Sequence, residues 1–98
     1  MSAVNGVRGE VSVVLAGEVR RLCLTLGALA EIETGLQVSG LAALAERMRA
    51  LSAGDLLVVL AALLRGGGER NLAEGLADAA VDPREAAEAV ARAFAAVA

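Results

Sequence analysis

The sequence predicts an α+β domain in which an N-terminal β-hairpin packs on a small bundle of about four to five helices. Two patterns carry this prediction. Apolar residues alternate on both sides of Gly17-Glu18, and apolar residues recur at helical spacing from residue 26 to residue 97. The chain has 98 residues, which is enough for one domain with one core. We therefore expect a flexible tail over residues 1–8 and a single domain over 9–98, with the hairpin in 9–25 and the helices in 26–97.

The hairpin is predicted from its turn as well as from its strands. Gly17-Glu18 fits the two central positions of a type II′ turn, in which glycine comes first. This turn places Val13 opposite Leu22 and leaves Cys23 on the face away from the core. The core face then collects a set of aliphatic side chains, namely Val11, Val13, Leu15, Leu22 and Leu24.

The first two helices are predicted from apolar spacing and end signals. Thr25 is the expected N-cap of a helix over about residues 26–34, and Gly35 its C-terminal glycine. Ser39 is the expected N-cap of a second helix over about residues 40–51. The apolar positions of this helix fall at helical spacing: Leu41, Leu44, Met48 and Leu51.

A third helix, over about residues 53–65, has the strongest local signals. Ser52 followed by Asp55 resembles a capping box and predicts the helix start. An unbroken apolar run extends from Leu56 to Leu64, so this helix is apolar nearly all round. Such a helix lies either at the centre of a core or at an interface. Two readings stay open: the helix is central, or its apolar residues Leu60, Leu63 and Leu64 face a partner.

The remaining elements follow a run of glycines. Gly66–Gly68 ends the third helix and is interpreted as a flexible connection or a hinge, because a phosphate loop would need a preceding strand and a Lys or Thr. Asn71 begins a weak fourth helix over about residues 72–80. Asp82-Pro83, followed by Glu85, predicts the start of a last helix over about residues 83–97.

The composition argues against catalysis and against several kinds of ligand. The chain has no His, Tyr or Trp, and its single Cys cannot form an internal disulfide or a zinc cluster. The net charge of −3 disfavours nucleic-acid binding. The longest apolar run is shorter than the roughly 20 residues that cross a membrane, and the N-terminus is not a signal peptide. We expect a cytoplasmic protein that is not an enzyme and that has no cofactor, metal or small-molecule substrate.

Three stretches of the sequence resemble a known family. They are Gly9-Glu10 before the hairpin, the run Leu24–Glu33, and Leu64–Gly68. Their order and spacing are similar to the small tail proteins of gene transfer agents and related prophages. This family is described as a tail assembly chaperone and is sometimes labelled a tail tube protein. The resemblance covers roughly residues 9–70.

The resemblance implies a tail morphogenesis protein in the cytoplasm of a bacterial host. A tail assembly chaperone coats the tape measure protein before tail tube subunits polymerise around it. Its expected partners are therefore the tape measure protein and the tail tube protein. We assign partner binding to the end of the third helix and the glycines after it: Leu60, Leu63, Leu64, Arg65, Gly66, Gly67 and Gly68. The outer edge of the hairpin is expected to pair copies of the chain side by side.

Two alternatives remain at this point. One is a minor structural component of the tail. It is less favoured because tube subunits are usually built on larger β-sandwich folds than two strands allow. The other is a small dimeric adaptor or regulatory domain unrelated to phage, which would use the hairpin as its dimer edge.

Overall fold

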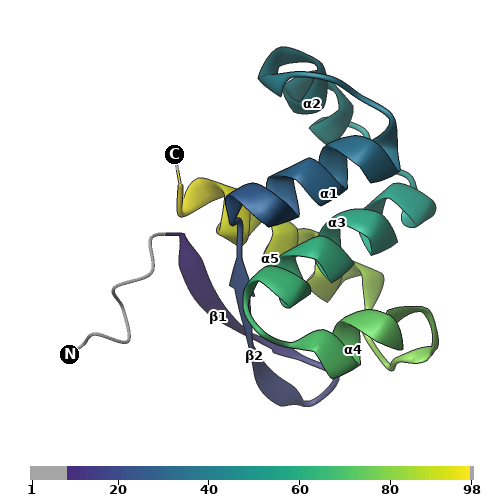
Figure 1. Ribbon diagram of the computed structural model, residues 1–98. Helices are drawn as coiled ribbons and strands as arrows, with labels where there is room; N and C mark the ends of the chain where they lie inside the picture. Colours follow the sequence, from purple (N-terminus) through teal and green to yellow (C-terminus); the bar gives the residue numbers. More distant parts are fainter. Residues whose placement is uncertain (1–8, 98) are drawn as a thin grey trace.

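Two β-strands and five α-helices make up the part of the chain that the computed structural model describes, residues 9–97 (Figure 1). The predicted tail over residues 1–8 lies outside this part. The elements in chain order are β1 (Glu10–Leu15), β2 (Glu18–Cys23), α1 (Leu26–Leu36), α2 (Leu41–Met48), α3 (Ala53–Gly66), α4 (Arg70–Glu74), a 3₁₀ turn η2 (Leu76–Asp78) and α5 (Pro83–Ala95). An N-terminal hairpin followed by helices confirms the predicted α+β class.

The hairpin forms, but its predicted register is wrong by two residues. Leu22 lies opposite Val11 instead of Val13. The turn residues are Ala16 and Gly17, whose φ angles of 54° and 81° are both positive, as a type I′ turn requires. A shift of two residues keeps every side chain on its predicted face. The hairpin therefore still buries the aliphatic side chains Val13, Leu15 and Leu22.

Helix α3 is the centre of the fold. It contacts α1, α4, α5 and strand β2 (Figure 1). The predicted capping box is present, because Ser52 Oγ accepts from the Asp55 N–H at 3.0 Å and Asp55 Oδ2 accepts from the Ser52 N–H at 3.2 Å. The buried residues of the helix lie on more than one side: Val59, Leu60, Ala62, Leu63 and Leu64. Of the two readings left open above, the structure supports the central helix.

The ends of α1 and α2 differ from the prediction. Helix α1 continues through Gly35 to Leu36, and Gln37 takes the left-handed conformation that ends it. Gly35 instead allows α1 to pack closely against α3, since a Cβ at this position would overlap Val58 of α3. Helix α2 begins after Gly40 rather than Ser39, and it has no side-chain cap.

The chain after α3 contains less regular helix than predicted. Instead of one helix over residues 72–80, the five-residue α4 is followed by the turn η2, with Gly75 between them. The last helix starts as predicted, because Asp82 Oδ1 accepts from the Arg84 N–H at 2.9 Å. Its buried face consists mainly of alanines, which allow α5 to pack closely against α3 and the hairpin: Ala86, Ala89, Val90 and Ala93.

Candidate partner-binding surfaces

The three leucines predicted to anchor a partner lie in the core. Leu60 is 2% exposed, and Leu63 and Leu64 are fully buried. They fill the space between α3 and the elements around it. In this conformation a partner could reach them only if the domain opened. Arg65, the next residue in the predicted set, is partly exposed, and its Nε donates to Glu31 Oε2 at 2.8 Å.

The predicted glycine hinge is a packing contact. A Cβ at Gly66 would overlap the carbonyl oxygen of Cys23. A Cβ at Gly67 would lie 2.5 Å from the carbonyl carbon of Arg21 and 3.0 Å from the Leu22 nitrogen. All of these neighbours are backbone atoms of β2, which cannot relieve an overlap by changing rotamer as a side chain can. The glycines therefore allow the end of α3 to lie directly against the strand, and a freely swinging connection does not fit this arrangement.

The same contact buries Cys23, which keeps its predicted face of the hairpin. The end of α3 covers the end of β2, so Cys23 is 1% exposed although it does not belong to the main hydrophobic cluster. Burial, with a smaller contribution from Glu10, raises the pKa of the Cys23 thiol. A raised pKa favours the thiol over the thiolate, which is the reactive form.

Glu69 covers the middle of the outer edge of β2. Its Oε2 accepts from the Arg21 N–H at 3.0 Å, and its Oε1 lies 3.5 Å from the guanidinium of Arg20. The Arg21 N–H, one of the outward backbone groups of β2, is therefore already bonded within the chain. Pairing of copies through the hairpin edge stays a prediction. Sequence reasoning missed Glu69, because its partners lie far away along the chain.

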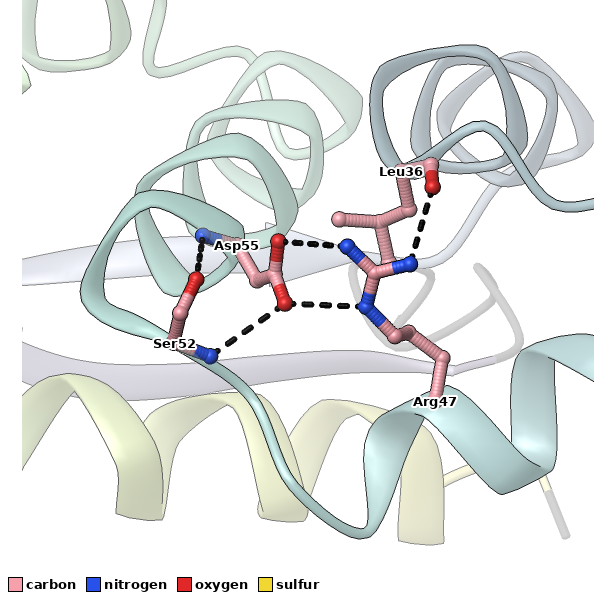
Figure 2. A network of polar contacts seen from close by, with 4 residues as sticks. All are labelled: Leu36, Arg47, Ser52 and Asp55. Carbon is pink, nitrogen blue, oxygen red and sulfur yellow. Dashed lines mark hydrogen bonds and ion pairs between the residues drawn. The ribbon is translucent and has the colours of Figure 1, made fainter.

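Helix α2 lies at the end of the molecule away from the hairpin and is held by one polar network (Figures 1 and 2). The Arg47 guanidinium donates to both carboxylate oxygens of Asp55, at 3.0 Å and 2.9 Å, and to the carbonyl oxygen of Leu36 at 3.0 Å. Asp55 is also the acidic member of the capping box with Ser52. One arginine thus connects α2 to the end of α1 and the start of α3.

This network makes the stability of the fold depend on pH. The Arg47 guanidinium and the Ser52 N–H hold the pKa of Asp55 below its ordinary value. A carboxyl group with a lowered folded-state pKa stabilises the fold above its ordinary pKa, and this contribution is lost as the pH falls through the folded-state value. We expect Arg47→Gln to lower the melting temperature at pH 7, with a difference from wild type that shrinks toward about pH 3.

Circular dichroism melts across this pH range would measure the difference. The matched control is Arg49→Gln, because Arg49 forms an exposed pair with Glu46 at 3.8 Å that contributes little at any pH. A constant difference between Arg47→Gln and wild type down to pH 3 would contradict the assignment to Asp55.

An apolar groove lies between α1, α2 and α5. Its volume is about 560 Å³, and every residue along it is apolar. Leu41 and Val97 are 68% and 44% exposed, so part of this apolar surface faces solvent. The larger residues of the groove are Leu24, Leu29, Leu41, Leu44, Met48, Phe94 and Val97. We call this surface the α2–α5 groove.

The sequence contained part of the signal for this groove. Leu41 and Met48 are among the apolar positions predicted for the second helix, but such spacing does not show whether another element covers them. A second hollow of about 740 Å³ lies between α1, α3 and α4. It is more open, and its lining combines small residues with polar ones such as Glu31 and Arg65, so it offers a partner fewer large apolar side chains to contact.

Two further features of the described part of the chain concern metal sites and membrane spans. No group of three or more Cys, Asp or Glu side chains within residues 9–97 is arranged to hold a metal ion. Among the helices of the described part, none is long and apolar enough to cross a membrane.

Comparison with known proteins identifies the family. The family model described as phage tail tube protein, GTA-gp10, matches residues 8–98. No curated protein and no solved structure gives a match. The match covers nearly the whole chain and confirms the gene transfer agent and phage tail family that the sequence resembles. This chain therefore belongs to the phage tail tube protein family of GTA-gp10, a family of structural phage tail proteins.

Proposed function

We propose that this protein is a tail assembly chaperone that holds an amphipathic helix of the tape measure protein in the α2–α5 groove. The α2–α5 groove is the observation that carries the proposal. It offers only apolar side chains, and two of its large residues, Leu41 and Val97, are exposed to water in the isolated chain. Membership of a phage tail family supports the context of tail assembly.

The walls of the groove suit a helix that binds reversibly. An amphipathic helix inserts apolar side chains at helical spacing into a groove of this kind. Met48 and Phe94 lie along it, and the flexible thioether of Met48 can adapt to different side chains along a long partner. Helix α2 forms one wall of the groove, and Leu44 and the Arg47–Asp55 pair fix it to the rest of the fold.

The strands favour a chaperone over a subunit of the tube wall. Within residues 9–97 the sheet contains two strands, β1 and β2. A β-sandwich needs two sheets packed face to face. A minor structural component of the finished tail is also compatible with the family match, and the experiment below distinguishes it.

The proposal predicts that a charge in the groove prevents binding. We expect Leu41→Asp to weaken capture of the tape measure protein at least tenfold, because a carboxylate would lose its water on contact with an apolar helix. Leu41 is mostly exposed, so the variant should keep its fold. The matched control is Leu26→Asp at the first residue of α1, since Leu26 is 83% exposed and lies outside the groove.

Binding can be measured by co-expression with the tape measure protein, followed by pull-down and a mass determination of the complex. Several copies on one tape measure chain, lost in Leu41→Asp and kept in Leu26→Asp, would support the proposal. Equal capture of both variants would exclude the groove. Recovery of the protein from purified, finished tails would instead identify a structural component.

A further inference from the structure

The two edges of the hairpin differ in how they are covered. Leu15 and Glu18 are the hydrogen-bonded pair next to the turn. Hydrogen-bonded and non-hydrogen-bonded pairs alternate along an antiparallel ladder, so the backbone N–H and C=O groups of Ser12 and Val14 point away from β2. Glu69 and the glycines at the end of α3, Gly66 and Gly67, cover the outer edge of β2 from Arg21 to Cys23. Within residues 9–97, no hydrogen bond reaches the outward groups of Ser12 and Val14.

Strand β1 also lacks the features that prevent an edge from pairing. It contains no Pro, no Lys and no bulge between Glu10 and Leu15. Ser12 is exposed, and Val14 is 58% exposed. An uncovered, regular edge of this kind is a template for another strand.

Helix α5 presents a patterned row of charges beside this edge. Glu85, Glu88 and Arg92 fall at positions i, i+3 and i+7, so they share one side of the helix, and they border a hollow of about 190 Å³ between α5 and β1. Among the ion pairs of the described residues, none includes these three side chains. The row is acidic toward the start of α5 and basic toward its end.

The middle of the charged row on α5 lies at the same level as the middle of strand β1. Gly9 contacts Val97, and Val14 borders the same hollow as Glu85, so α5 runs antiparallel to β1. A strand advances about 3.3 Å per residue and a helix about 1.5 Å. The three residues from Gly9 to Ser12 therefore match about six or seven residues of α5. Ser12 lies near the level of Val90, which is midway between Glu88 and Arg92.

We propose that two copies of this chain associate by pairing their β1 strands antiparallel about a two-fold axis at Ser12. The two hairpins then form one four-stranded sheet, in which the outward backbone groups of Ser12 and Val14 bond to the other copy. The same axis places Glu88 opposite Arg92 of the partner subunit, and Arg92 opposite the partner's Glu88. The charges on α5 change from acidic to basic along the helix. Two copies of this row attract each other when the two helices run in opposite directions, as the two-fold axis requires, so a second copy of the chain is the occupant.

The first test uses proline on each edge of the hairpin. Val14→Pro removes an N–H that points out of β1, and Val19→Pro removes the equivalent N–H on β2, while neither N–H belongs to the β1–β2 ladder. We expect wild type and Val19→Pro to form a dimer of twice 9.8 kDa in sedimentation velocity. Val14→Pro should raise the dimer dissociation constant at least tenfold.

A second set of variants leaves the strands unchanged and guards against misfolding of the proline variants. Glu88→Arg and Arg92→Glu should each weaken the dimer at least fivefold, and the double variant should restore it, because the exchanged pair is again complementary. Glu74→Arg on α4 is the charge-matched control and should have no effect. The amide of Val14 should become protected from hydrogen exchange as protein concentration rises.

Several results would overturn the proposal. They are a monomeric wild type at several hundred micromolar, equal effects of Val14→Pro and Val19→Pro in folded proteins, or a double charge variant weaker than either single one. The edge of β1 and the α2–α5 groove are separate surfaces, so neither the success nor the failure of this test bears on the proposed binding of the tape measure protein.

Discussion

Replacing Gly67 with alanine is expected to destabilise the fold by about 3 kcal/mol, at the upper end of the range for overpacked positions. The new Cβ would lie 2.5 Å from the Arg21 carbonyl carbon and 3.0 Å from the Leu22 nitrogen. The backbone of Gly67 has φ −90° and ψ 0°, which alanine can adopt, so the cost comes from the collision and not from backbone strain. Relief requires the end of α3 to move away from β2, which would also separate Glu69 from Arg21.

Thermal denaturation followed by circular dichroism would measure this effect. A loss of about 3 kcal/mol corresponds to a decrease of about 12 °C or more in the melting temperature of a domain this size. The matched control is Gly54→Ala in the same helix, where the added Cβ would meet only Ser52 Oγ at 3.9 Å. We expect this control to be neutral or to stabilise the helix by up to about 1 kcal/mol. Equal melting temperatures for Gly67→Ala and wild type would show that the glycine run is a loose connection after all.

Placing a carboxylate at Leu64 is expected to unfold the protein. Leu64 is fully buried on α3, so Leu64→Asp would remove apolar contacts and bury a charge without a partner. The truncation Leu64→Ala introduces no charge and should cost about 2–5 kcal/mol through the lost apolar contacts and the cavity left behind. The upper value reaches the lower end of the roughly 5–15 kcal/mol by which native proteins are usually stable, and the buried charge of Leu64→Asp adds to it.

A matched substitution on the exposed side of α3 gives the control. Leu57 is 41% exposed on the same helix, and Leu57→Asp should keep both the helical signal and a cooperative melt. The comparison also decides between the two roles first considered for the end of this helix. If Leu64→Asp stays folded and only loses its partner, Leu64 is a contact residue and the assignment to the core is incorrect.

Local signals in the sequence determined where the strongest elements begin. The start of α3 depends on hydrogen bonds between Ser52 and Asp55, and the start of α5 on Asp82 with Pro83 next to it. These interactions join residues at most three positions apart, so they do not depend on how the rest of the chain folds. The alternation around Gly17 likewise determined that a hairpin forms and which of its faces is buried.

The register of that hairpin needed more than the hydrophobic pattern. Two pairings that differ by two residues bury the same side chains, so the pattern satisfies both equally. The choice between them depends on the turn, and the chain accepts a positive φ of 54° at Ala16 to place the turn one residue earlier than predicted. A non-glycine residue in this conformation is uncommon, and the sequence gives no reason to expect one there.

The burial of particular residues was decided only by tertiary structure. The sequence showed that α3 is apolar on nearly every side, but not that α1, α4, α5 and β2 together leave Leu60, Leu63 and Leu64 no access to a partner. The glycine run indicated flexibility by composition, whereas the structure uses it for close contact with β2. The α2–α5 groove and the uncovered edge of β1 exist because no other described element packs over them. Capping and periodicity are interactions along one segment, whereas burial and exposure depend on which segments meet across the whole fold.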